Sequence, residues 1–483
     1  MQVVVETRAG TVRGAVRDGI ATWRGIPYAH PPRFRPPEPI AWAGERDATS
    51  FAPVAMQSRD PRTAMMSGIT DNVAMAEDCL ALNIYSPAAD GARRPVMVWI
   101  HGGAFYMGSG SQPLYNGTSF AKLHDIVVVT LNYRLGVFGL LYLGDRLGDD
   151  YAAGNVALLD QLAALRWVRD HIAAFGGDPD AITVMGESAG AVSVANLLAM
   201  PAARGLFHRA ILQSGASGLS PPTRIDANAF TDAYCAELGV APRQLPELPA
   251  EQLLAGQERI TRSLGLGAFT PYLDGVTISR LPIDTLRAGD GVCVPTLLGS
   301  NRDEWALFDL FVPGSTAIVI AQLRSRFGAA VDRMHAAYLA ARSDGSAERA
   351  WLDLVGEVAF RIPMIRLAEA QARHAPVWMY RFDWSSPAFG GKLGAAHALE
   401  LPFVWNVVDS PIGQLLLGGD ASAPPLARAM QTAWATFIRG AAPAAEDLPR
   451  WPIYEPPRRS TMTIDRESSV VDDPAGALRE LWP

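Results

Sequence analysis

The 483-residue sequence contains few cysteines and no long apolar run. Its three cysteines, Cys79, Cys235 and Cys293, are odd in number and lack the spacing of a metal site, so we expect reduced thiols in a cytoplasmic protein. No apolar run reaches the ~18 residues that a membrane-spanning helix needs. The first residues lack the basic and long apolar segments of a secretory signal, so export is not expected.

The sequence also lacks a run of basic residues, and its formal net charge is −7. A nucleic-acid groove requires clustered positive charge, so this composition argues against a polyanionic partner. Hydrophobic residues make up 49% of the chain and charged residues 19%, which is typical of a folded globular protein. We expect a small-molecule substrate, no nucleic-acid or membrane partner, and a monomer or small homo-oligomer.

Apolar runs of strand length alternate with amphipathic segments along the chain. Expected strands lie at 94–100, 126–133, 181–185, 209–215, 295–301 and 376–384, and expected helices at 155–175, 191–200 and 425–440. This alternation predicts an α/β fold with a large, mostly parallel sheet flanked by helices. We expect one domain over 1–483, with helical excursions at about 220–290 and 305–375.

The stretch ITVMGESAGAVSV, residues 182–194, contains the pattern G-x-S-x-G around Ser188. The pattern alone is weak, and an ordinary serine between two glycines is the alternative. An expected strand before it and an expected helix after it are typical of a nucleophile elbow. Gly186 and Gly190 leave room for the two elements to pack closely, and the helix N-terminus favours negative charge beside Ser188.

A serine nucleophile needs a general base and an acid that orients it. The histidines downstream of Ser188 are His208, His335, His374 and His397. His397 is preferred because it follows an expected strand through a glycine-rich loop, where such sheets carry function. Asp303 and Glu304 follow another expected strand; we choose Glu304 first and Asp303 second, with a solvated surface carboxylate as the alternative.

A glycine-rich turn, WIHGGAFYMGSG at 99–110, directly follows the expected strand at 94–100. Small residues at 102–104 let backbone N–H groups face a cavity, as an oxyanion hole requires. Such loops can also hold phosphate, but the lysine of a P-loop is missing and no dinucleotide-binding fingerprint is present. Nucleotide binding is therefore the weaker alternative.

These motifs together resemble the type-B carboxylesterases, which are α/β-hydrolases grouped with the cholinesterases and the bacterial para-nitrobenzyl esterases. The resemblance runs in order along essentially the whole chain, through WRGIPYAHPPRFRPPEP, AEDCLALNIY, VWIHGGAFYMGS, LNYRLGVFG, GESAG, ILQSG, PYLDG, GSNRDEW, HALELPFVW and WPIY. It implies an α/β-hydrolase fold whose helical insertions form a gorge over the active site. It also implies serine carboxylesterase activity without a cofactor or metal, and with broad specificity.

Carried over position by position, the resemblance implies a role for each of several residues. The implied catalytic residues are Ser188, Glu304 and His397, and the implied oxyanion donors are the N–H groups of Gly103, Ala104 and Ala189. Ser214 and Glu187 are implied supporting residues, and Phe269, Leu307 and Phe308 are implied lining of the substrate pocket.

The sequence departs from the family pattern at three places. Ala104 stands where most members have glycine, and its Cβ would narrow the oxyanion hole against bulky alcohol groups. Cys79 matches a cysteine that is usually bridged, but the partner position is Ala55, so that disulfide is absent. The loop 56–77 lacks the tryptophan that holds quaternary ammonium in cholinesterases, so choline esters are not expected.

Two other functions use the same sequence features. An amide or carbamate hydrolase would need the same catalytic groups. A non-catalytic binding protein of the cholinesterase type is also conceivable, although such proteins usually lose a member of the triad, and this chain retains all three.

Gly265 and Gly267 fall near the wall of the acyl pocket in the resemblance, which predicts a roomy pocket. We expect benzoate esters to be hydrolysed at least as fast as acetate esters of the same alcohol, because no large side chain fills that wall. Initial rates on the matched pair test this expectation, and a strong preference for acetate would contradict it.

Overall fold

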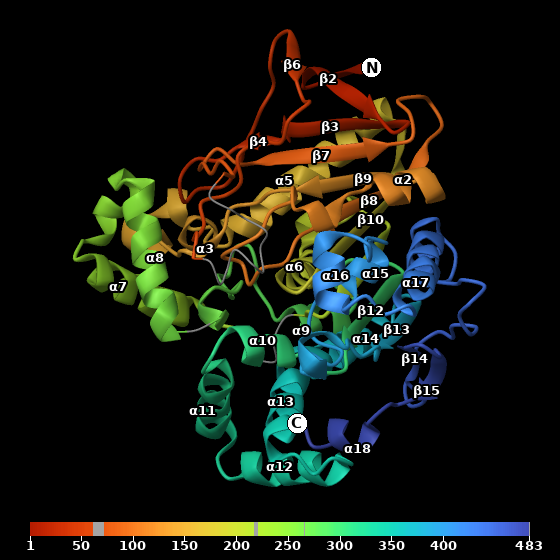
Figure 1. The fold of residues 1–483 in the computed structure, drawn as a ribbon. Helices are drawn as coiled ribbons and strands as arrows, with labels where there is room; N and C mark the ends of the chain where they lie inside the picture. The colour runs from red at the N-terminus through yellow and green to blue at the C-terminus, as the bar shows by residue number, and fades with distance from the viewer. Residues whose placement is uncertain (61–71, 217–220, 265, 483) are drawn as a thin grey trace. The chain divides into compact units, whose positions relative to one another are not determined.

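The computed structural model describes residues 1–60, 72–216, 221–264 and 266–482 (Figure 1). They form two compact units, which are described in turn: Met1–Ile211 with Leu219–Val294, and Leu212–Gly218 with Pro295–Pro483. Gly265, one of the two glycines expected near the wall of the acyl pocket, lies outside the described residues. So does much of the loop at 56–77. No helix among the described residues is long and apolar enough to cross a membrane.

The first unit is built on a sheet that changes from antiparallel to parallel. Its strands lie in the order β1 (Gln2–Thr7), β2 (Gly10–Arg17), β3 (Ile20–Pro27), β7 (Ala81–Ser86), β9 (Val127–Leu131), β8 (Arg94–Ile100) and β10 (Gly177–Glu187). Neighbours are antiparallel from β1 to β9, and β9–β8–β10 are parallel. The short strands are β6 (Glu45–Asp47), which pairs with β2, and the pair β4 (Ala29–His30) and β5 (Glu38–Pro39).

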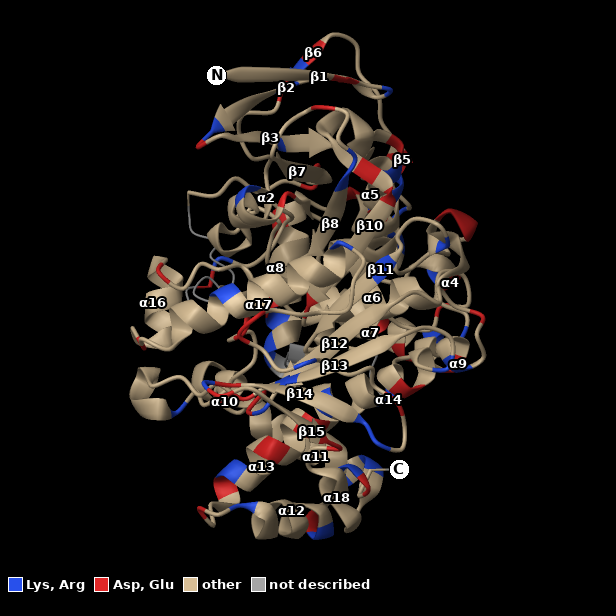
Figure 2. Cartoon of the chain, turned by 90° about the vertical axis from the view of Figure 1, so that its right-hand side faces the viewer, with Lys and Arg blue, Asp and Glu red and all other residues tan. Residues whose placement is uncertain are grey.

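The helices of this unit are α2 (Thr118–His124), α3 (Gly136–Leu140), α4 (Gly144–Leu147), α5 (Val156–His171), α6 (Ala189–Ala199), α7 (Arg224–Leu238), α8 (Ala250–Leu264) and α9 (Pro282–Arg287). Helix α2 packs on β7 and β9, whereas α7 and α8 pack on each other. Helices α5 and α6 both pack on β10. Helix α6 carries no charged residue, as Figure 2 shows, and is almost wholly buried, because it is enclosed by other elements of this unit.

The second unit contains the parallel strands β12 (Thr296–Asn301), β13 (Val377–Phe382) and β14 (Ser460–Ile464), followed by the antiparallel β15 (Ser469–Asp472). Strand β11 (Arg209–Gln213) spans the boundary between the units. The helices are α10 (Ala306–Phe311), α11 (Ser315–Phe327), α12 (Ala330–Ala341), α13 (Ala347–Gly356), α14 (Ile362–Gln371), α15 (Leu401–Val404), α16 (Pro411–Leu417), α17 (Ala423–Ile438) and α18 (Gly476–Arg479). A π-helical turn, η7 (Glu357–Arg361), joins α13 to α14.

The predicted α/β class is confirmed, because parallel strands flanked by helices occur in both units. Several boundaries differ by a few residues, and the difference around Ser188 bears on the site. Strand β10 continues to Glu187 and α6 begins at Ala189, so Ser188 alone separates them. The glycines on either side allow this close approach, whereas the sequence pattern suggested a five-residue turn.

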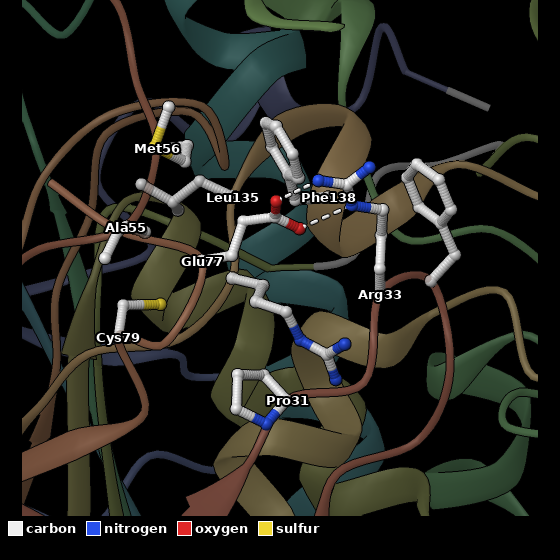
Figure 3. Close-up of a pocket in the computed structure, with 11 residues that line it drawn as sticks. Pro31, Arg33, Ala55, Met56, Glu77, Cys79, Leu135 and Phe138 are labelled. Atoms are coloured by element: carbon white, nitrogen blue, oxygen red, sulfur yellow. Dashed lines mark hydrogen bonds and ion pairs between the residues drawn. The ribbon is translucent and has the colours of Figure 1, made fainter. Parts of the chain in front are cut away.

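A small pocket of the first unit contains the position of the absent disulfide. Ala55 and Cys79 both line it, on the side away from the ion pair of Arg33 with Glu77 (Figure 3). Cys79 is a free, buried thiol, and burial raises its pKa. Cys235 and Cys293 are also free. In place of a disulfide, this part of the fold is held by packing, by the Arg33–Glu77 ion pair and by hydrogen bonds such as those between Gln57 and the backbone of Gly108.

A buried ion pair connects α5 to the loop that follows β9. Arg134 donates from Nε and Nη2 to the two carboxylate oxygens of Asp160, over 2.8 and 2.6 Å, and from Nη1 to the carbonyl of Pro32 over 2.7 Å. Both side chains are buried. A buried charge is tolerated only while its partner and hydrogen bonds remain, so neither residue can be removed alone without a large cost.

Asp160→Ala should lower the free energy of unfolding by about 3–5 kcal/mol, because it leaves the Arg134 guanidinium buried and unpaired. Arg134→Met with Asp160→Leu should cost less, since no charge stays buried. Urea denaturation followed by fluorescence measures both, and Asp170→Ala in the exposed pair with Arg169 is the control. A larger loss in the double variant than in Asp160→Ala would contradict the argument.

Candidate active site

Ser188 lies at the sharp turn between β10 and α6. Its φ of 54° and ψ of −123° place a non-glycine residue in a region that is strained for L-amino acids. The side chain is half-buried, and it stands one residue before the first turn of α6, where N–H groups point outwards. The backbone therefore makes a sharp strand-to-helix turn at Ser188, which is the geometry that the predicted nucleophile elbow requires.

The two glycines around Ser188 are required by close backbone contacts. A Cβ on Gly186 would lie 2.5 Å from the carbonyl carbon of Gly190. A Cβ on Gly190 would lie 2.0 Å from the carbonyl oxygen of Ile100, the last residue of β8. The motif therefore presses the start of α6 against the end of the neighbouring strand.

The loop after β8 lies directly beside Ser188. A Cβ on Gly102 would be 2.7 Å from Oε2 of Glu187 and 3.1 Å from Cβ of Ser188. The next residues turn the chain with three successive positive φ values, 109° at Gly103, 50° at Ala104 and 61° at Phe105. Such a run presents successive N–H groups to one concavity, which suits a developing oxyanion.

Two buried aromatic side chains brace this loop. His101 Nδ1 lies 2.8 Å from the carbonyl oxygen of Gly102, so Nδ1 carries the proton and donates it. Burial lowers the pKa of His101 to about 4, which keeps its ring neutral at ordinary pH. Tyr133 stacks on this ring at 4.5 Å and donates its hydroxyl to the His101 carbonyl over 2.9 Å.

Glu304 and His397 form a buried pair in the second unit. Nδ1 of His397 lies 2.7 Å from Oε2 of Glu304, and the exposed fractions of the side chains are 5% and 2%. The other carboxylate oxygen of Glu304 accepts the backbone N–H of Asn301 over 2.7 Å, and His397 N–H donates to the Glu304 carbonyl over 3.3 Å. With the carboxylate on Nδ1, proton transfer to or from this ring uses Nε2.

The alternative acid and bases have other contacts. Asp303 accepts the N–H of Ala395 over 2.7 Å and pairs with Arg302, so it holds the loop before His397 rather than the imidazole. His335 stacks on Trp351 at 4.0 Å. His208 Nδ1 accepts the N–H of Ile182 over 3.2 Å.

The remaining predicted residues fall into two groups. In the first unit, Ala189 is the first residue of α6 and follows Ser188 directly. Phe269, in the same unit, is buried, and its ring centroid lies 5.4 Å from that of Phe230. In the second unit, Ser214 is buried with a φ of 49°, and its N–H donates to the Gly299 carbonyl over 2.8 Å. Leu307 is half-buried on α10, one residue before Phe308.

Phe308 and Phe360 lie against the imidazole of His397, with ring centroids 5.0 and 4.5 Å from it. The two phenyl rings are also nearly parallel to each other, 5.9 Å apart. Phe360 belongs to the π-helical turn η7, and sequence reasoning missed it because a lone phenylalanine in a helical segment carries no signal. These rings keep water from the imidazole and form an apolar wall beside it.

Asn301 and Glu400 were also missed, although both stand within motifs that carry the resemblance, GSNRDEW and HALELPFVW. Both are buried and hydrogen-bonded to each other over 2.7 Å. No group of three or more metal-binding side chains occurs among the described residues. What the described residues do offer is a strained serine, a braced N–H loop and a carboxylate–histidine pair.

Known proteins resemble this chain over nearly its whole length. A profile of the carboxylesterase family matches residues 1–479. The para-nitrobenzyl esterase of Bacillus subtilis is 39% identical over 99% of this chain and 98% of its own. The phenmedipham hydrolase of Pseudarthrobacter oxydans is 37% identical over 97% and 96%. The crystal structure of carboxylesterase EST55 of Geobacillus stearothermophilus superposes with a TM-score of 0.88, at 42% identity over 99% and 100% of the two chains. These likenesses establish the α/β-hydrolase fold.

Gly102→Ala should lower kcat/KM for a simple ester by about 100-fold or more, because the new methyl group displaces the loop that presents the oxyanion donors. Gly91→Ala is the matched control, since no atom lies within 4 Å of a Cβ there. Ester kinetics and thermal melting of both variants make the measurement. If Gly102→Ala left kcat/KM unchanged, the loop at 102–105 would not be part of the active site.

Proposed function

We propose, since the chain belongs to the carboxylesterase family, that this carboxylic ester hydrolase works through Ser188, His397 and Glu304 and a covalent acyl-enzyme. The observation that carries the proposal is the 2.7 Å contact between His397 Nδ1 and Glu304 Oε2. That contact, buried and aligned by the Asn301 N–H, prepares a histidine for general-base catalysis.

In the first half-reaction, His397 Nε2 takes the hydroxyl proton of Ser188 while the serine oxygen attacks the ester carbonyl. Glu304 accepts the Nδ1 proton as a hydrogen bond and stabilises the positive charge on the ring. His397 then gives its proton to the leaving alkoxide, and the alcohol departs. The acyl group remains on Ser188 as an ester.

In the second half-reaction, His397 removes a proton from water, which attacks the acyl carbonyl. The acid is released, and the proton returns to Ser188. In both halves the carbonyl oxygen becomes negative, and the N–H groups of Gly103, Ala104 and Ala189 bind it. Each such donor contributes roughly 3 kcal/mol of transition-state stabilisation.

The surroundings of His397 favour apolar esters, and we propose that esters of different sizes are accepted. Phe308 and Phe360 offer aromatic faces rather than charges, so this side of the site suits an acyl or alcohol group without charge. The free cysteines and Ala55 opposite Cys79 agree with work in a reducing compartment such as the cytoplasm.

Ser188→Ala should lose at least about 10³-fold in kcat for a p-nitrophenyl ester, because it removes the nucleophile. An organophosphate should add one phosphoryl group per chain to the parent enzyme and none to Ser188→Ala, as intact mass spectrometry measures. Ser50→Ala, at an exposed serine, is the control and should be labelled fully. Absence of labelling in the parent enzyme would favour a non-catalytic binding protein.

A further inference from the structure

Glu400 is a second buried carboxylate close to the Glu304–His397 pair. It follows His397 by three residues and is 0% exposed. A buried carboxylate is costly unless hydrogen bonds or opposite charge compensate it. The mechanism proposed above does not use Glu400, so its presence in the interior needs another explanation.

Both oxygens of Glu400 accept N–H groups from side-chain amides. Gln213 Nε2 donates to Oε1 over 2.9 Å, and Asn301 Nδ2 donates to Oε2 over 2.7 Å. Other contacts fix the orientation of both amides. Gln213 Oε1 accepts the indole N–H of Trp434 over 3.3 Å, and Asn301 Nδ2 also donates to the Ala396 carbonyl over 2.6 Å. Two donors fixed on two oxygens match an ionised carboxylate.

Asn301 links this carboxylate to the acid–base pair. Its backbone N–H donates to Glu304 Oε1 over 2.7 Å, while its side chain holds both Glu400 and the carbonyl of Ala396, the residue before His397. One asparagine therefore joins the end of β12 to the loop that carries the imidazole. Glu400 provides the fixed acceptor that keeps the Asn301 side chain in this position.

The charged groups that face Glu400 are Glu304 and His397. Burial is the main cause that raises the pKa of Glu400, and Glu304 raises it further, whereas Asn301 and His397 lower it. The Gln213 amide of β11, which faces Glu400, and the Trp434 indole of α17, which contacts that amide, carry no charge. A negative charge here favours the protonated imidazole, since opposite charges attract strongly at low dielectric.

We propose that Glu400 is a positioning residue of the acid–base pair: as an anion it anchors Asn301 and stabilises the imidazolium form of His397. The proposal rests on the proposed roles of Glu304 and His397. Under this proposal two carboxylates set the basicity of the His397 imidazole. Glu304 acts by direct contact, and Glu400 acts through Asn301 and by its charge.

Glu400→Gln should move the acid limb of the pH profile of kcat/KM to lower pH by roughly 0.5–1 unit, because the free-enzyme imidazole loses a stabilising charge. It should also lower the alkaline plateau about 3- to 30-fold, since a weaker base transfers protons less well. Glu369→Gln, which neutralises a carboxylate bound to Arg459 in the same unit, is the control and should leave the limb in place.

The new amide of Glu400→Gln points an N–H group at the N–H donor of Gln213 or Asn301, and this clash opposes folding. Gln213→Met with Glu400→Gln removes the clash and still removes the charge, so it should fold and show the same shift. Gln213→Met alone keeps the charge and should leave the limb unmoved. An unmoved limb in a folded charge-free variant overturns the proposal, even if the rate falls.

The outcome is separable from that of the proposed function. Organophosphate labelling of Ser188 and the activity of the parent enzyme test the triad without any change at Glu400. A parent enzyme that is labelled and active, together with an unmoved limb, rejects the role of Glu400 alone. A parent enzyme that is neither labelled nor active rejects both.

Discussion

The close approach of Gly190 to the Ile100 carbonyl is the constraint on which the Ser188 side of the candidate site depends. A Cβ there would stand 2.0 Å from the oxygen, so only glycine lets α6 start against the end of β8. That contact forces the turn at Ser188 into its strained conformation and brings the loop at 102–105 beside it. The strained backbone at Ser188 therefore presents the serine hydroxyl next to the loop whose N–H groups are the expected donors.

The acid–base side of the site is organised by hydrogen bonds rather than by steric contact. Asn301 donates from its backbone to Glu304 and from its side chain to Glu400 and the Ala396 carbonyl. Asp303 holds the same loop at the preceding residue, through the Ala395 N–H. Neighbouring acids thus divide the work: Glu304 contacts the imidazole, and Asp303 and Glu400 hold the backbone that presents it.

Much of this arrangement could be predicted from local pattern. The apolar runs at β8 and β9, the amphipathic α5 and the turn around Ser188 all follow from residues that are close in sequence, and the structure has them where they were expected within a few residues. Phe360 could not be predicted, because its contact with His397 depends on a π-helical turn and on packing between residues that 36 intervening positions of the chain separate. Glu400 was missed because nothing in its neighbourhood reveals that its charge is buried.

The sequence by itself determined the class of fold and predicted the strained turn at Ser188, because spacing of glycines and apolar residues acts locally on backbone geometry. It also narrowed the acid to two adjacent residues, Asp303 and Glu304. Only the tertiary structure showed which of the two contacts the imidazole, because adjacent side chains leave the backbone in different directions. Glu304 reaches His397 Nδ1, and Asp303 reaches the Ala395 N–H. The same packing decides which carboxylates are buried, and burial sets how strongly each charge acts on the imidazole.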